Sequence, residues 1–402
     1  MRYTVLSFLC VATLIAYVQR SALGVPSKTI EAELGLGPKA LGLVWLGWYA
    51  AYAVFQLPSG WLAERLGSKS ALVIFAILWS LITGLVGLST GFVGLLVLWT
   101  LMGGAQAGIF PCATRAIGAT FSRTEQALAS GWLACSMALG AALAQKLTGN
   151  LLGPLTWQEI LILYSVPGVV WALIYAVAVP RPDVPLEMKS RSDSPRTPWS
   201  RLFTNPNMIL LCLQQFQRAG ATALFFTWFP RYLQETKHVS ALESGSLAAW
   251  PLLAGMCGGL VGGYASDGLL KATGSTRLSR QGLAVAAMVV CAGVSLSAFW
   301  VSDPALAVGL ISIAAFCGYV GGVSAYATAI SMGGKRVAPV FATMNMSGNI
   351  GAGLFPFAVG IMVEETGNWD LALLLFAIMY AGSGVCWLFL NPKGTLFDEE
   401  HS

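Results

Sequence analysis

Two arginines inside apolar stretches are the residues of this sequence best suited to chemistry. Arg20 lies in "AYVQRSAL" directly after Gln19, and Arg218 lies in "CLQQFQRAG". A charge inside a membrane costs from ~3 to above 10 kcal/mol depending on the method, so it indicates a functional role. A guanidinium does not lose its proton in proteins, and it binds a carboxylate or phosphate through two parallel hydrogen bonds. Both arginines are therefore predicted to be anion receptors; the alternative for Arg20 is a side chain that extends outward to water.

Uncharged amides accompany these arginines at helical spacing. Gln214, Gln215 and Arg218 are three to four residues apart, so they share one helix face. Asn345 and Asn349, four residues apart, also share a face, which suits contact with hydroxyl or carboxylate groups. The alternative for Arg218 and all these amides is a hydrogen-bond network that only holds helices together.

The composition places these residues in a membrane protein. The chain has 402 residues, of which 56% are hydrophobic and 10% charged, whereas soluble domains carry about 25% charged residues. A spanning helix needs roughly 20 mostly apolar residues. Twelve such segments are expected, and they begin at Tyr3, Lys39, Ser70, Phe92, Ala127, Trp157, Asn205, Ala241, Gln281, Pro304, Pro339 and Trp369. The predicted fold is an all-α membrane protein with twelve transmembrane helices.

The distribution of basic residues predicts the topology. If the N-terminus is cytoplasmic, sixteen of the 23 Lys and Arg residues fall on the cytoplasmic side and five on the outer side, with Arg20 and Arg218 inside helices. This excess follows the positive-inside rule. It predicts that both termini are cytoplasmic in a bacterial-type inner membrane. The net charge of +5 is explained by topology, so no nucleic-acid partner is expected.

A hydrophilic linker divides the predicted helices into two sets of six. The longest polar stretch, residues 180–207, is rich in proline, serine and charge. The expected organisation is an N-terminal bundle over residues 1–180, a cytoplasmic linker over 181–204, a C-terminal bundle over 205–392 and a cytoplasmic tail over 393–402. Two pseudo-symmetric halves suggest a duplicated transporter, whose substrate site lies near the membrane midplane between the halves.

Two loops carry a shared pattern that suggests gating. "GWLAERLGSK" (60–69) and "GGYASDGLLK" (262–271) each place an acid four residues after a glycine, at Glu64 and Asp267. The first loop resembles the signature of the major facilitator superfamily, G-x-L-A-D-R-x-G-R-K, with Glu64 replacing aspartate and Ser68 replacing a basic residue. The resemblance implies the major facilitator fold and a cytoplasmic gate, whose expected members are Gly60, Glu64, Arg65, Gly67, Lys69 and Asp267.

A narrower resemblance concerns the substrate. "AYVQRSAL", with Tyr17 three residues before Arg20, is similar to the first-helix Y-x-x-R element of the anion:cation symporter family. "GIFPCATRAIGATF" (108–121), "FFTWFPRYL" (225–233) and "MNMSGNIGAGLFPFAVG" (344–360) resemble further segments of that family. The resemblance implies a carrier of sugar acids or other small carboxylates, with Arg20 on the substrate carboxylate and asparagines on its hydroxyl groups. Arg20 and Arg218 are expected to supply positive charge from opposite halves.

Departures from that family concern proton coupling. Gln19 stands where the family often has an acid before the arginine, and Gln106 stands where its fourth helix often has glutamate. None of the 18 Asp and Glu residues, and neither His238 nor His401, falls in the predicted membrane core. Because proton symport normally needs a titrating residue there, we expect uniport, exchange or coupling to another ion. Tyr17, Gln19, Gln106, Gln214, Gln215, Asn345 and Asn349 complete the expected substrate-binding set with the two arginines.

Other function classes find less support in the sequence. It contains no phosphate-binding loop, no zinc spacing and no buried Ser/His/Asp set, so no enzyme, cofactor or metal is expected. The expected partners are a small organic anion and the lipid bilayer, for a monomeric protein. Two alternatives remain open, namely a carrier of neutral or drug-like solutes with structural arginines, and a membrane sensor that does not transport. Aromatic residues at Tyr17, Tyr49, Tyr52, Trp132, Tyr319 and Tyr326 are candidates for cavity walls.

Overall fold

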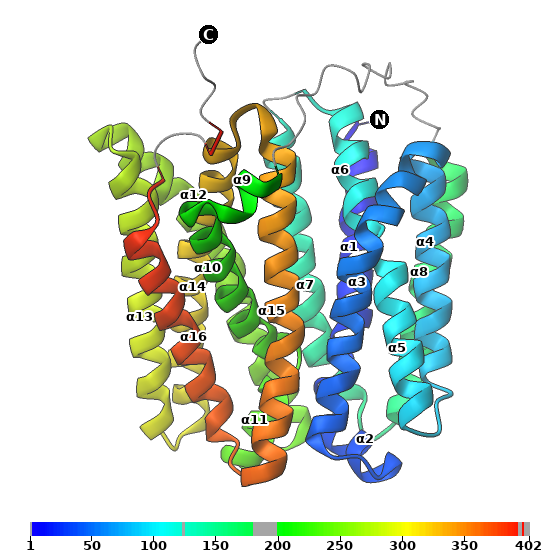
Figure 1. Cartoon of the computed structure of the whole chain (residues 1–402). Helices are drawn as coiled ribbons and strands as arrows, with labels where there is room; N and C mark the ends of the chain where they lie inside the picture. Colours follow the sequence, from blue (N-terminus) through cyan, green and yellow to red (C-terminus); the bar gives the residue numbers. More distant parts are fainter. Residues whose placement is uncertain (1, 123–124, 180–198, 393–395, 398–402) are drawn as a thin grey trace. The chain divides into compact units, whose positions relative to one another are not determined.

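The computed structural model describes residues 2–122, 125–179, 199–392 and 396–397, and these form helices joined by short connections (Figure 1). The first part of the chain forms α1 (Arg2–Arg20), α2 (Ser27–Leu34), α3 (Pro38–Leu66), α4 (Ser68–Val86), α5 (Phe92–Gln106), α6 (Ile109–Thr120), α7 (Gln126–Leu151) and α8 (Trp157–Ala178). The second part begins with α9 (Trp199–Thr204), α10 (Pro206–Ala223), η2 (Leu224–Phe226), α11 (Phe229–Thr236) and α12 (Ala241–Thr273). It continues with η3 (Arg277–Gly282), α13 (Leu283–Ser297), η4 (Ala298–Trp300), α14 (Pro304–Gly333), η5 (Gly334–Arg336), α15 (Val337–Thr366) and α16 (Asp370–Phe389).

The predicted all-α membrane fold is confirmed. Among the described residues, 11 helical segments are long and apolar enough to cross a membrane. The remaining expected span, the one beginning at Asn205, coincides with α10, which has 18 residues. Gln214, Gln215, Gln217 and Arg218 in the second half of α10 lower its hydropathy, so the expected count of twelve is not reproduced on apolarity alone.

Local sequence signals explain where several helices begin and end. Pro38 and Pro304 occupy the first turn of α3 and α14, where a missing N–H costs no hydrogen bond. Thr156 and Glu159 form a reciprocal capping box at the start of α8. Gly35 ends α2 in the left-handed conformation (φ 63°), which glycine adopts without a steric penalty. Proline, glycine and side-chain capping thus mark these helix boundaries.

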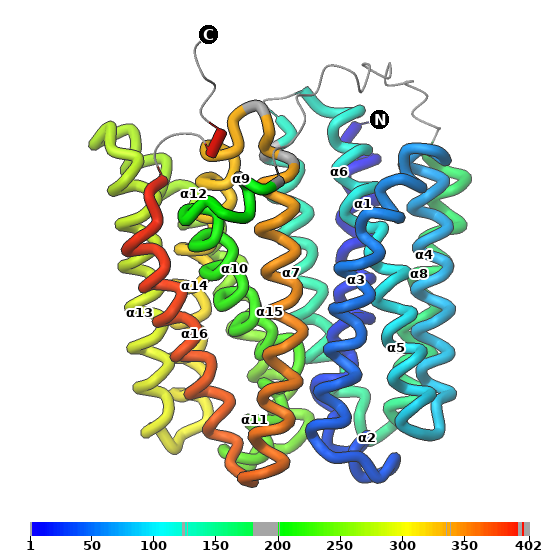
Figure 2. Tube along the Cα trace, in the orientation of Figure 1, coloured from blue at the N-terminus to red at the C-terminus, as the bar shows by residue number. Residues whose placement is uncertain are grey.

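The chain forms two compact units, which are described separately. Unit 1 comprises Met1–Lys189, Phe225–Leu252 and Pro356–Trp369, and unit 2 comprises Ser190–Leu224, Leu253–Phe355 and Asp370–Ser402. In unit 1, α1 packs on α7, α3 on α5, and α4 on α8; in unit 2, α13 packs on α14 and α16, and α10 packs on α16. Figure 2 traces the chain from α10 through η2 into α11, where it passes from unit 2 to unit 1.

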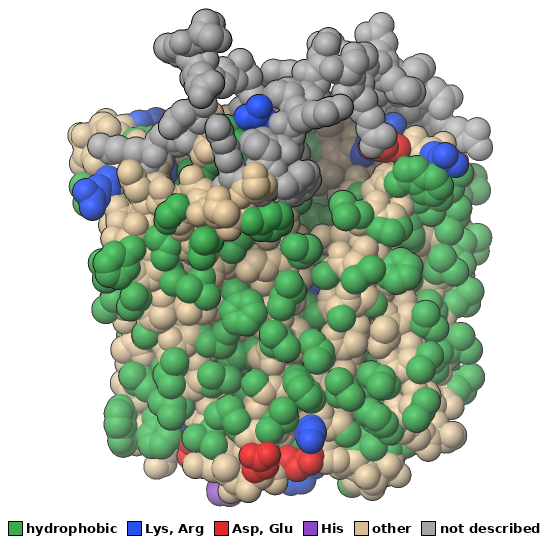
Figure 3. All heavy atoms as spheres, in the orientation of Figure 1, with side chains coloured by type: hydrophobic (Ala, Val, Ile, Leu, Met, Phe, Trp, Pro, Cys, Tyr) green, Lys and Arg blue, Asp and Glu red, His purple; other side chains and the backbone are tan. Residues whose placement is uncertain are grey.

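The expected division of the sequence into two bundles stays a prediction. The linker predicted for residues 181–204 lies outside the described residues up to residue 198, and so does all of the predicted tail except residues 396 and 397. Hydrophobic side chains cover much of the helix surfaces seen in Figure 3, while coloured Lys, Arg, Asp and Glu side chains gather near helix ends. Exposed apolar residues such as Leu57 and Val177 fit lipid contact on such surfaces.

Candidate functional site

The centre of the first candidate site is Arg20, the last residue of α1. Its guanidinium carbon lies 4.0 Å from the centroid of the Trp48 ring, which is the shortest of its ring contacts. Four more rings lie at 5.0 to 5.8 Å. Together the five residues form what we call the aromatic cage: Tyr17, Trp48, Tyr49, Tyr52 and Phe226.

Local helix geometry brings most of this cage together. Tyr17 precedes Arg20 by three residues on α1, and its hydroxyl accepts a hydrogen bond from Arg20 Nη1 at 3.3 Å. Trp48 and Tyr52, one helical turn apart on α3, stack with ring centroids 5.0 Å apart. Phe226 comes from η2 and meets Tyr17 edge to face at 6.2 Å. The cage thus combines α1 and α3 with a segment about 200 residues later in the sequence.

No acid compensates the charge of Arg20 among the described residues. The ion pairs found there join other residues, and none includes Arg20. Aromatic faces attract a cation by about 0.5–2 kcal/mol each, but they do not neutralise it. The cage therefore presents a positive charge that an incoming anion would pair with directly.

The two glutamines expected beside Arg20 make other contacts. Gln19 is fully buried, and its Nε2 donates to the carbonyl of Tyr164 on α8 at 2.7 Å and to Ser80 Oγ on α4 at 3.3 Å. Gln106 Nε2 donates to the carbonyl of Ala16 at 3.1 Å. The hydrogen bonds of both amides thus join neighbouring helices, which is a structural role common for amides in membrane helices.

Arg218, in unit 2, has a different environment. It is 7% exposed, and its Nη2 and Nε donate to Gln215 Oε1 at 3.0 and 3.3 Å. The Tyr326 ring lies 5.9 Å from its guanidinium carbon. A Cβ on Gly322 would come within 2.9 Å of Nη1, so glycine at this position of α14 makes room for the guanidinium. Arg218 also has no carboxylate partner among the described residues.

The other amides of unit 2 lie on the helices around this arginine. Gln214 is fully buried and donates to the carbonyl of Leu211 at 2.9 Å, and its Oε1 has no partner among the described residues. Asn349 Nδ2 donates to the carbonyl of Asn345 at 3.0 Å, so these two half-buried asparagines interact along α15. Gly348, between them in sequence, packs against the Gln215 side chain. The structure therefore brings the α15 asparagine segment next to the Arg218–Gln215 pair.

The predicted gating residues lie at the ends of helices. Gly67 joins α3 to α4 with φ 78°, a conformation that favours glycine. Arg65 lies over the Trp61 ring at 4.0 Å, and Lys69 Nζ donates to the carbonyl of Ala176 at 2.7 Å. Glu64 is exposed, without an ion-pair partner in the part of the chain that the structure describes.

The second loop pattern has its own ion pair. Asp267 accepts from Arg280 Nη2 at 3.3 Å, and Arg280 Nη1 also donates to Ser266 Oγ at 2.7 Å. This pair joins the end of α12 to η3 within unit 2. A Cβ added to Gly60, in the last part of α3, would meet the Pro111 side chain at 3.9 Å.

Several site residues were not among those expected from the sequence. Trp48 adjoins Tyr49 in "WYAAY", and the helical spacing to Tyr52 was the signal that could have identified it. Phe226 gave no local signal, because its role depends on tertiary packing. Of the aromatic candidates, Tyr17, Tyr49 and Tyr52 contact Arg20, whereas Trp132 is 57% exposed on the surface of α7. An exposed Trp on a membrane helix fits lipid contact better than a cavity wall.

Comparison with known proteins identifies related sequences of nearly the same length. The family model described as Major Facilitator Superfamily matches residues 9–334. The chain is 27% identical to the probable sulfoacetate transporter SauU of Cupriavidus necator, over 98% of this chain and 95% of that protein. It is 27% identical to the probable galactarate/D-glucarate transporter GudP of Bacillus subtilis, over 93% and 88% of the two chains. It is 25% identical to the D-galactonate transporter of Escherichia coli O6:H1, over 95% and 94%.

Solved structures show the same fold. The inward-facing, unoccupied crystal structure of a bacterial homologue of the human lysosomal transporter Spinster aligns with a TM-score of 0.75 at 19% identity, covering 97% of this chain and 94% of that one. The nucleoside transporter NupG aligns with a TM-score of 0.74 at 12% identity, covering 96% and 99%. At such identities the similarity establishes the fold alone.

Proposed function

Because the chain belongs to the major facilitator superfamily, we propose that it is a transporter that moves small organic anions across a membrane by alternating access. The observation that carries this proposal is Arg20, a guanidinium enclosed by five aromatic rings with no carboxylate partner among the described residues. An anion with a carboxylate or sulfonate group would supply the missing charge through charge-assisted hydrogen bonds. The relatives named for sulfoacetate, galactarate, glucarate and galactonate support this class of substrate.

Each unit, taken by itself, carries groups suited to such a substrate. In unit 1 the cage offers aromatic faces and tyrosine hydroxyls around Arg20. In unit 2, Arg218 is held by Gln215, and the nearby asparagines of α15 carry amides suited to hydroxyl groups. We assign Arg20, Tyr17, Arg218, Gln215, Asn345 and Asn349 to substrate contact, and we assign Gln19 and Gln106 to support of α1. Gln214 remains a candidate through its unpartnered Oε1.

The remaining features of the proposal follow from the sequence. Both termini are cytoplasmic in an inner membrane, the two six-helix halves alternate access to the substrate site, and the loops at Glu64 and Asp267 gate the cytoplasmic side. The protein acts as a monomer and needs no cofactor.

The experiment that tests the substrate class is a thermal-shift screen of the purified protein. We expect stabilisation by sulfoacetate, galactonate or glucarate, since a ligand that binds the folded state raises its melting temperature by mass action. The uncharged amide or alcohol analogue of each acid serves as the control. Equal stabilisation by the acids and their uncharged analogues would favour the alternative of a neutral-solute carrier, and binding without tracer flux in liposomes would favour a sensor.

A pH gradient alone is expected not to drive accumulation of the substrate. The described acidic residues lie outside the central parts of the spanning helices, and the neutral amides of Gln19 and Gln106 do not titrate near neutral pH. The measurement is the uptake of radiolabelled substrate into proteoliposomes with an imposed pH gradient and no other gradient. Downhill exchange between internal and external substrate, measured in the same vesicles, confirms that the protein is active. Uphill accumulation under the pH gradient would contradict this mode of transport.

A further inference from the structure

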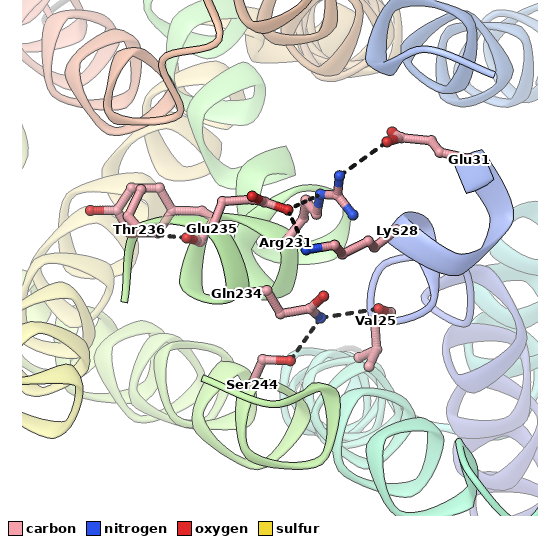
Figure 4. Close-up of polar contacts among 9 residues, drawn as sticks. Val25, Lys28, Glu31, Arg231, Gln234, Glu235, Thr236 and Ser244 are labelled. Carbon is pink, nitrogen blue, oxygen red and sulfur yellow. Dashed lines mark hydrogen bonds and ion pairs between the residues drawn. The ribbon is translucent and has the colours of Figure 1, made fainter. Parts of the chain in front are cut away.

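Four charged residues of unit 1 form a continuous network between α2 and α11 (Figure 4). Lys28 Nζ lies 3.1 Å from Glu235 Oε1, and Arg231 Nε lies 3.2 Å from the same oxygen. Arg231 Nη2 donates to Glu31 Oε2 at 3.2 Å. We call Lys28, Glu31, Arg231 and Glu235 the α2–α11 charge cluster. None of the contacts assigned to the substrate uses it.

The two ends of this cluster differ in burial. The side chains of Lys28 and Glu235 are 59% and 25% exposed, whereas those of Arg231 and Glu31 are 11% and 8% exposed. Glu31 Oε1 and Arg231 Nη1 are buried without a hydrogen-bond partner among the described residues. A carboxylate that has lost most of its hydration and holds one ion pair is poorly stabilised in its charged form.

The charges around Glu31 add to this effect. Arg231 favours ionisation of Glu31, but Arg231 is shared with Glu235, which itself repels Glu31. Glu364 of α15 also repels Glu31, while Lys28 on its own helix attracts it. Burial is the largest influence, and it raises the pKa of Glu31 to about 7 in spite of the arginine.

Further contacts around the cluster also join segments of the two predicted halves. Gln234 Nε2 on α11 donates to the carbonyl of Val25, before α2, at 3.2 Å. The Trp228 ring meets the Trp45 ring of α3 edge to face at 4.5 Å. The backbone N–H of Lys39, at the start of α3, donates to Glu364 at 3.0 Å. Segments from the two predicted halves thus close on each other at the end of unit 1 away from the N-terminus (Figure 1), which is the predicted outer side.

We infer that Glu31 is a proton-binding site of the outer gate, occupied when the gate is closed and emptied when it opens. The inference concerns regulation and goes beyond the proposed function; it needs the transporter fold but no particular substrate. When the gate opens, Glu31 meets water, and its pKa returns toward the ordinary value of about 4.3. Closing therefore takes up a proton from the outer solution, and opening returns it to the same side. External acid closes the gate without driving transport.

The sign and size of the effect follow from linkage. A group whose pKa is raised in one conformation stabilises that conformation as pH falls. For a closed-state pKa of about 7 and an open-state pKa of about 4.3, the ratio of closed to open protein rises roughly tenfold between pH 8 and pH 6. Well above pH 7 the closed gate has to bury an ionised carboxylate, so opening is favoured.

The test is a distance measurement across the gate in the full chain without substrate. Nitroxide labels on Thr29→Cys and Leu242→Cys, in a background with the native cysteines replaced by alanine, report the closed and open states by double electron–electron resonance. We expect the ratio of short to long distances to rise roughly tenfold from pH 8 to pH 6. Glu31→Gln, which imitates the protonated side chain, is expected to remove this dependence and to favour the short distance at both pH values.

The matched control is Glu33→Gln on the same helix. Glu33 is exposed and accepts hydrogen bonds from Trp157 and Gln158, so its loss should leave the pH dependence unchanged. Wild-type pH dependence in Glu31→Gln would overturn the inference.

If the Glu31→Gln variant does not fold, infrared titration of the unmodified protein tests the protonation of Glu31 directly. A protonated-carboxyl band that disappears with a midpoint near pH 7 supports the inference, and the absence of such a band overturns it. Neither the label distances nor the infrared band depends on whether the thermal-shift screen identifies a substrate.

Discussion

Replacement of Arg20 by methionine is expected to abolish binding and transport of the substrate anion while the protein remains folded. Removing one partner of a buried charged pair costs about 2–5 kcal/mol, and the lower figure already corresponds to about a 30-fold loss of affinity. Stability should change little, because the loss of cation–π attraction is offset by removal of a buried charge that has no acid partner among the described residues. The measurements are the dissociation constant from thermal shift, tracer uptake in liposomes, and the melting temperature without ligand.

Two further variants make this expectation specific. Arg20→Lys keeps the charge but loses the fork of parallel donors, so we expect a binding loss smaller than that of Arg20→Met. Arg336 lies over the Phe397 ring at 4.9 Å in unit 2, which makes Arg336→Met a control for loss of an arginine–aromatic contact elsewhere. Unchanged substrate affinity in Arg20→Met would refute the assignment of Arg20 to the substrate. An equal fall in the melting temperatures of Arg20→Met and Arg336→Met would indicate that Arg20 has a structural role.

The positions of the membrane helices could be read from the sequence because long apolar runs dominate it. The expected starts at Phe92, Trp157, Ala241 and Pro304 coincide with the starts of α5, α8, α12 and α14. The short helices α2 and α11 were not expected, because eight-residue segments lack an apolar period long enough to detect.

The surroundings of Arg20 were predictable only where they are local. Tyr17 lies one turn away on the same helix, so the sequence alone could pair them. Gln19 is the adjacent residue, and adjacent helical residues point about 100° apart. Gln19 therefore points away from Arg20 and contacts Ser80 and Tyr164. The resemblance to a family with an acid at this position had led us to expect Gln19 in the substrate site. Phe226 required knowledge of how η2 packs.

Glu31 shows the limit of reading charges by position. The sequence places Glu31 and Arg231 in outer segments, where charges are ordinarily hydrated. The structure pairs them across 200 residues of sequence and buries both. Burial of a residue in so short a helix as α2 depends on tertiary contacts such as those of Trp228 with Trp45, and no periodicity in "SKTIEAEL" indicates it.

Gln215→Glu is expected to inactivate the transporter as fully as Arg218→Ala does. Gln215 Oε1 already accepts from Arg218 at 3.0 and 3.3 Å, so a carboxylate there would form an internal ion pair with little rearrangement. That pair would occupy the guanidinium that we assign to the substrate, and an incoming anion would have to displace it. The expected loss of affinity is at least about 30-fold, from about 2 kcal/mol or more for a close buried charge pair. Tracer uptake and thermal shift measure it.

The comparison that separates charge from packing is Gln215→Leu, which removes the hydrogen bonds to Arg218 without adding an acid. We expect this variant to keep measurable transport, because Arg218 retains its charge. Gly322→Ala is a second way to move the Arg218 guanidinium without adding charge. The new Cβ would lie 2.9 Å from Arg218 Nη1, so the end of this flexible side chain would have to shift. It should weaken substrate binding while moving the melting temperature little. Equal loss of transport in Gln215→Leu and Gln215→Glu would show that transport requires the glutamine itself. Unchanged substrate affinity in Arg218→Ala would refute the role of Arg218 as an anion receptor.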